Sequence, residues 1–270
     1  MTVNNQFSLF DAGVALFSNP QWCFMCALSS ALIAERVATF FKLDCTVARS
    51  CKTIGNAFAT CVSFSDGVIA IQALYRIVHD IRTVWPNRME RPKEIQRKNH
   101  DFTTQTCPKQ WLVERVVASS LQFFGCFIDF SKFLAGSGVI SYAPSCGVQI
   151  VGKGCSILHL FYCIYESTRK MEAGPPDFGT NLSLQRGSFE YRELYHTYNK
   201  YEIAKKSACI FLKVIGMISL FNLFKKNSLS TKVSKHYKGL FLSGFTFLTA
   251  LIAMQHFSAT AKMQWIKSTW

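Results

Sequence analysis

The C-terminal quarter of the chain reads apolar, basic and apolar, and this order constrains the fold more than any other feature. Residues 207–224 are mostly apolar and hold one charge, Lys213, while residues 239–261 run without any Asp, Glu, Lys or Arg. A helix rises about 1.5 Å per residue, so either arm can approach a bilayer core that is about 30 Å thick. The sequence therefore predicts a helical hairpin in a membrane.

The segment between the two arms is polar and basic. After Glu202 the chain carries ten lysines and no acid, which supplies +10 of the formal net charge of +14. A basic segment can bind nucleic acid or an anionic membrane surface. Because these lysines flank apolar arms, we expect contact with anionic lipid headgroups and no nucleic acid, with a merely solvated loop as the alternative. The candidates are Lys225, Lys226, Lys232, Lys235 and Lys238.

Charge is scarce in the chain as a whole. Charged residues make up 17% of the sequence, against about 25% in ordinary soluble domains. This shortage favours a membrane protein, although a mean hydropathy of +0.15 predicts a mixture of spanning and amphipathic helices. The first nine residues hold no Lys or Arg, so we expect no classical cleaved signal peptide.

The hydrophobic periodicity predicts an all-α fold of about six helices, the last two forming the membrane hairpin. A helix should begin at Pro20, capped by Asn19, and run to Phe40. The other upstream helices are expected at residues 53–85, 111–134, 148–170 and 188–206. These divide the chain into N-terminal apolar helices (1–85), a basic polar linker (86–110), an amphipathic helix pair (111–172), a loop (173–187) and a helix that leads into the hairpin (188–270).

Several of these apolar helices carry a narrow polar stripe. The candidate intramembrane polar residues are Asp66, Asp129, Lys153 and His159. An acid within a membrane helix is a functional hypothesis by default, and Lys132 could form a local ion pair with Asp129 from position i+3. We favour an inner polar seam of a helix bundle, with a path for ions or small solutes as the alternative.

The eleven cysteines and six histidines do not form a recognisable site. Cys23 and Cys26 make a C-x-x-C pair, but a zinc site needs a second pair or a nearby histidine. Two thiols on one face of an apolar helix are the favoured interpretation, and the cysteines are expected to be reduced. No sequence motif of a hydrolase, metalloprotease or phosphate-binding loop occurs, so we expect no catalytic, cofactor-binding or metal-binding residues.

Two apolar arms around a polar turn resemble the bilobed hydrophobic hairpin of chlamydial inclusion-membrane proteins. Residues 207–224 and 239–257 carry this resemblance, and the connecting segment here is long and basic. The resemblance implies a secreted bacterial protein in a host-derived vacuole membrane, with both ends in the host cytosol.

The sequence thus predicts a non-enzymatic helical protein, integral to a membrane or anchored to it, with a structural or interaction role. Its predicted partner is the lipid bilayer, and the sequence does not identify a protein partner. One alternative is a small channel or transporter that uses the polar stripes. Another is a soluble helical effector in which the hairpin is only a core element.

Overall fold

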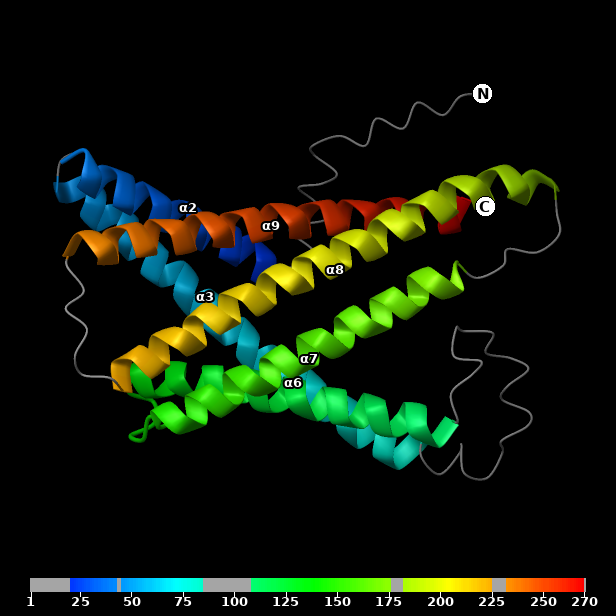
Figure 1. The fold of residues 1–270 in the computed structure, drawn as a ribbon, viewed down its shortest axis with the longest axis horizontal. Helices are drawn as coiled ribbons and strands as arrows, with labels where there is room; N and C mark the ends of the chain where they lie inside the picture. The colour runs from blue at the N-terminus through cyan, green and yellow to red at the C-terminus, as the bar shows by residue number, and fades with distance from the viewer. Residues whose placement is uncertain (1–19, 43–44, 85–107, 176–181, 225–231, 270) are drawn as a thin grey trace.

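The computed structural model describes residues 20–42, 45–84, 108–175, 182–224 and 232–269. Within these residues the fold is all-α and contains no strand, which confirms the predicted class and the six helices. The elements are α2 (Pro20–Phe40), α3 (Cys45–His79), the π-helical η1 (Asp80–Val84), α6 (Pro108–Gly136), α7 (Cys146–Ala173), α8 (Leu182–Phe224) and α9 (Lys232–Thr269), shown in Figure 1.

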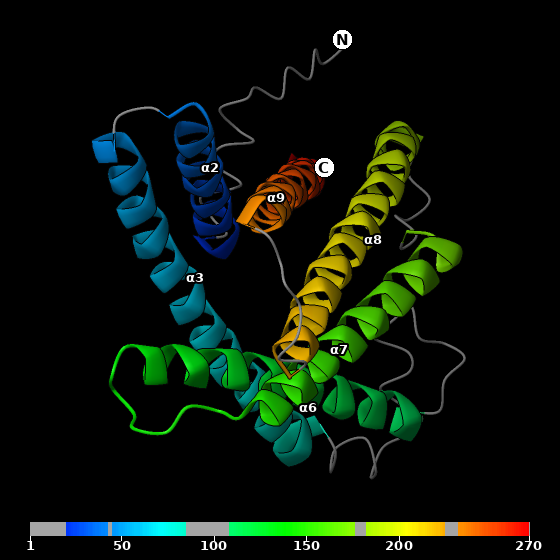
Figure 2. The same ribbon diagram turned by 60° about the vertical axis from the view of Figure 1, so that its left-hand side comes forward.

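The helices form a closed ring. Each packs on its neighbours in the sequence, and α2 closes the ring by packing on α9, an order that can be followed in Figure 2. Neighbours run antiparallel, as pairs of contacts show. For example, Trp22 of α2 packs beside Phe257 of α9, whereas Arg36, near the end of α2, meets Gly239 near the start of α9.

Local sequence explains several helix ends. Pro20 begins α2 as predicted, because its fixed φ suits the first helical position. The Ser145 hydroxyl accepts a hydrogen bond from the Val148 amide at the start of α7, and Gly174 ends that helix with a φ of 75°. Lys42 follows α2 with a φ of 52°, a left-handed conformation that helix ends often use but that usually falls to glycine.

Three predicted boundaries need correction. Helix α3 begins eight residues before the predicted Thr53, and α8 joins the predicted 188–206 helix to the first hairpin arm without a break. Lys232, Lys235 and Lys238 belong to the first turns of α9 rather than to a loop. No Pro or Gly occurs in residues 45–53 or 232–238, so nothing stops these helices from extending backwards from their apolar segments. Lys225 and Lys226 lie outside the described residues.

Small residues bring neighbouring helices close together. A Cβ atom added to Gly152 of α7 would lie 2.9 Å from the side chain of Ile128 on α6, and one added to Gly125 would collide with the Ser156 hydroxyl. On α3, a Cβ atom at Gly67 would lie 2.8 Å from the Phe130 ring. Close approach at glycine and serine is the usual packing of helices in a membrane, where no hydrophobic effect drives helices together.

Four helices are long and apolar enough to cross a membrane. They are Gln21–Phe40, Cys45–Arg82, Cys146–Ala173 and Gly239–Met263. The side chains of α8 are described only as far as Leu220. The predicted span at 207–224 extends beyond that residue, so it stays a prediction.

Candidate functional site

A polar seam crosses the interior of the ring, and Asp129 of α6 is at its centre. The Lys213 ammonium of α8 donates a hydrogen bond of 2.6 Å to Asp129 Oδ2, and Lys153 Nζ of α7 lies 3.8 Å from Oδ1. Lys132, the predicted local partner, also interacts electrostatically with Asp129, and the two ion pairs come from other helices. The sequence marked Lys213 only as a charge within an apolar arm, because its partner is 84 residues away.

Asp66 of α3 extends this seam toward α2. Gln21 donates a hydrogen bond of 3.1 Å from Nε2 to Asp66 Oδ1. Asp66 also interacts electrostatically with Lys213, Asp129 and Lys153. Three of the four predicted polar residues, Asp66, Asp129 and Lys153, are thus brought together, with Lys213 and Gln21 as members that the sequence did not reveal.

His159, the fourth predicted residue, is not part of the seam. Its Nδ1 lies 3.0 Å from the Ala118 carbonyl oxygen of α6. Because a carbonyl only accepts, the proton is on Nδ1, and Nε2 is left as the acceptor facing Cys163 Sγ at 3.5 Å. His159 therefore ties α7 to α6, and its place along a polar path with the other three stays a prediction.

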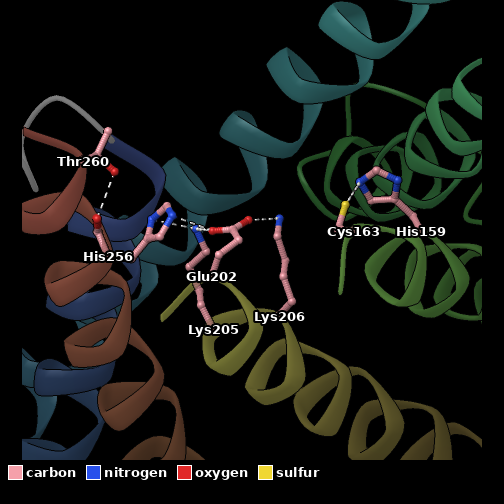
Figure 3. A network of polar contacts seen from close by, with 7 residues as sticks. All are labelled: His159, Cys163, Glu202, Lys205, Lys206, His256 and Thr260. Atoms are coloured by element: carbon pink, nitrogen blue, oxygen red, sulfur yellow. Dashed lines mark hydrogen bonds and ion pairs between the residues drawn. The ribbon is translucent and has the colours of Figure 1, made fainter. Parts of the chain in front are cut away.

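A second polar cluster joins α8 to α9 (Figure 3). Glu202 lies 2.5 Å from Lys205, 3.4 Å from Lys206 and 2.8 Å from His256. Lys205 and His256 are each only 5% exposed. The sequence contained a signal for this cluster, since Glu202 precedes the two lysines at helical spacings of three and four, and His256 is the one titratable ring in a long uncharged run.

The hydrogen-bonding geometry fixes the tautomer of His256. Lys205 Nζ lies 3.1 Å from His256 Nδ1, and an ammonium can only donate, so Nδ1 is the acceptor. The imidazole proton is then on Nε2, which faces Glu202 Oε2. Burial acts to raise the pKa of Glu202, but the contact with His256 and the charges of Lys206 and Lys205 outweigh it and hold that pKa well below its usual value.

Aromatic rings enclose this cluster. Lys205 Nζ lies 5.2 Å from the centre of the Phe257 ring and 5.9 Å from that of Trp22 on α2, distances typical of cation–π contacts. The Tyr198 and His256 rings lie 4.5 Å apart. The cluster therefore ties α2, α8 and α9 together through charges that are shielded from water.

A third buried charge lies where α3 passes into η1. Asp80 is fully buried, and the Arg115 guanidinium of α6 lies 2.8 Å from its carboxylate. Sequence reasoning missed this pair, because both residues look like ordinary charges at helix ends. The pair joins α6 to the end of α3 and continues the antiparallel packing begun by Gly67 and Phe130.

The chemistry of these clusters is that of charge pairing. Among the described side chains, no group of three His, Cys, Asp or Glu residues is placed to hold a metal ion. Cys23 and Cys26 lie on α2, and all ten described cysteines are free. Comparison with protein-family models, curated proteins and solved structures found no match for this chain. The class that the structure defines is an all-α protein with four candidate membrane spans.

Proposed function

We propose that the chain is an integral membrane protein with a structural or interaction role and no catalytic activity. The observation that carries this proposal is the distribution of side chains between inside and outside. Of the fifteen buried apolar side chains in the described part of the chain, nine are alanines, and charged or polar groups such as Asp80, Asn199 and Lys205 are buried beside them. Large apolar side chains face outward instead, including Ile71 at 69% exposure and Phe64 at 62%.

This distribution is the reverse of what water favours. Apolar surface in water costs about 25 cal/mol per Å², and monomeric soluble proteins rarely expose large contiguous apolar patches. Lipid removes that cost, and charges placed inside the ring and paired there avoid the penalty of facing hydrocarbon. The soluble-bundle alternative is therefore disfavoured, and the lipid bilayer is the proposed partner.

Extraction at alkaline pH tests the proposal. The full chain should stay with the membrane pellet in sodium carbonate, as an integral protein does. Deleting residues 239–261, the longer hairpin arm and the one without a charged residue, should release most of the protein if that arm is the principal anchor. A full chain that carbonate extracts completely would disprove membrane integration.

A small channel or transporter is the second candidate, and the polar seam favours it. The charged side chains of the seam are partly exposed. The exposed fraction is 18% for Lys153, 23% for Asp129 and 31% for Lys213. Lys213 also reaches past α7 to a helix that is not its neighbour, so the seam lies on the inside of the ring. Partly exposed charges at this place could line a path for a small ion.

Ion flux in liposomes decides between the two candidates. A transport role requires that Asp66→Asn and Asp129→Asn abolish a flux that the unchanged protein supports. Lys170→Gln is the matched control, because it removes a charge from an exposed pair with Glu166 away from the seam. No flux above that of protein-free liposomes would leave the structural role as the better-supported function.

The particular membrane is also part of the proposal. The hairpin resemblance supports a host-derived vacuole membrane, reached by a secreted bacterial protein. Immunofluorescence of an epitope-tagged chain in infected cells tests this, and a signal confined to the bacterial envelope would contradict it.

A further inference from the structure

Arg36 and Gly239 meet where α2 and α9 cross. A Cβ atom added to Gly239 would lie 2.8 Å from Arg36 Cζ and 2.9 Å from its Nη2. The guanidinium therefore rests directly on the bare backbone of α9, in space that any other residue at position 239 would fill. Arg36 as a whole is partly exposed, although its Nε atom is buried.

The guanidinium lacks a counter-charge in the described part of the chain. Arg36 Nε is buried without a hydrogen-bond partner, and none of the ion pairs among the described residues includes Arg36, although Glu35 is its neighbour in sequence. A guanidinium carries five donors in a planar fork. Its best partners are carboxylates and phosphates, which accept two of these hydrogen bonds at once.

The position of this guanidinium along the helices indicates which partner is available. Gly239 is the first residue of the candidate span Gly239–Met263, and Arg36 lies in the last turns of Gln21–Phe40. Both helix ends lie at the same end of the ring, at the left of Figure 1. The edge of a membrane span is the level of lipid phosphates, and neither α3 nor α9 has an acid in its first turn there.

We propose that Arg36, seated on Gly239, binds the phosphate of a membrane lipid headgroup. The inference rests on membrane integration, the proposed function, and adds a specific site to it. Arg36 would donate two hydrogen bonds to phosphate oxygens. Position 235 of α9 lies one turn before Gly239, so Lys235 and the neighbouring Lys238 add positive charge to the same part of the helix and favour an anionic lipid over a zwitterionic one.

The test uses the purified full chain in a neutral detergent, with dioctanoyl phosphatidic acid as the probe and thermal unfolding as the readout. The lipid should raise the unfolding temperature of the unchanged protein, and Arg36→Gln should weaken the apparent affinity about tenfold or more. Arg49→Gln is the matched control, because it removes one positive charge from an exposed position near the start of α3. Unchanged affinity in Arg36→Gln, or an equal loss in Arg49→Gln, would overturn the site.

A second variant and a second ligand sharpen the result. Gly239→Ala should displace the guanidinium and weaken lipid binding while helicity measured by circular dichroism is kept, and full affinity in that variant would contradict the geometry. Inorganic phosphate should compete poorly with the lipid for Arg36. If inorganic phosphate raised the unfolding temperature as much as the lipid does, and if this rise depended on Arg36, a lipid would be ruled out as the specific ligand. Carbonate extraction of Arg36→Gln distinguishes the lipid site from membrane integration. The variant should stay in the membrane pellet, because loss of the lipid site leaves membrane integration intact.

Discussion

Lys213 Nζ lies 2.6 Å from Asp129 Oδ2, and the two residues belong to α8 and α6, which are separated in the ring by α7. Each is a charge in a mostly apolar helix, and each would be costly to insert alone. The ion pair, with Lys153 beside it, lets both charges lie inside the ring. It also links three consecutive helices through one carboxylate.

The first prediction contrasts the whole protein with the isolated arm. In the folded chain, Lys213→Leu should destabilise by up to about 3 kcal/mol, because Asp129 loses its main partner. This figure is the lower end for breaking a fully buried ion pair, and this pair is only partly buried. In an isolated segment of residues 207–224, the same change should strengthen insertion, since a central lysine costs about 2.5–3.5 kcal/mol.

Thermal unfolding in detergent measures the first effect, and a translocon insertion assay measures the second. The double variant Lys213→Leu with Asp129→Leu should recover much of the lost stability, because it removes both charges together. A Lys213→Leu protein as stable as the unchanged one would show that the pair does not hold the helices together.

The second prediction concerns the close contact of α6 and α7. Gly152→Ala places a methyl group 2.9 Å from the Ile128 side chain, so we expect a destabilisation of about 1–3 kcal/mol from overpacking. Gly154→Ala is the matched control on the same helix, where an added Cβ atom meets nothing within 4 Å. It should leave the unfolding temperature unchanged or raise it, because alanine favours a helix over glycine. Equal effects of the two changes would disprove the close packing.

The third prediction is a pH dependence of stability that comes from Glu202. Its pKa is lowered in the folded protein from an ordinary value of 4.5, so its contribution to stability is fully present above that value. The contribution is lost as the pH falls below 4.5 toward the folded pKa. Glu202→Gln should therefore be less stable than the unchanged protein at pH 7, and the difference should shrink below pH 4.5. A constant difference from pH 7 to pH 3 would contradict the assigned charge.

The fourth prediction is the topology. Because neighbouring helices run antiparallel all round the ring, we expect α6 and α8 to cross the membrane alongside the four candidate spans. Single cysteines introduced at Asn99 and Ser183 should then be labelled from one side, the cytoplasmic side by the positive-inside rule. Cysteines at Val139 and Ser230 should be labelled from the other side.

The background for this experiment replaces the eleven native cysteines. If only the four candidate spans cross the membrane, Ser183→Cys should be labelled from the side opposite to Asn99→Cys. Val139→Cys should then be labelled from the same side as Asn99→Cys. Labelling of Ser230→Cys from the side of Asn99→Cys would contradict both arrangements.

The sequence by itself determined the all-α class, a number of about six helices and most of their extents. Local features are sufficient for these, because apolar periodicity and the helix start at Pro20 depend on residues within one or two helical turns. It also marked Asp66, Asp129 and Lys153 as a polar seam, since a charge in an apolar helix must face the inside of a bundle. Helix starts such as Cys45 and Lys232 were missed, because a helix extends through polar residues when no Pro or Gly stops it.

Only the tertiary structure decided which charges pair. The partners of Asp129, Glu202 and Asp80 include residues on other helices, and periodicity gives the face of a helix but not the helix that it meets. The closure of the ring by α2 on α9 brings Arg36 to Gly239, two residues with nothing in their local sequence to connect them. Packing across more than two hundred residues of chain depends on the complementary shapes of whole helices, which no short pattern encodes.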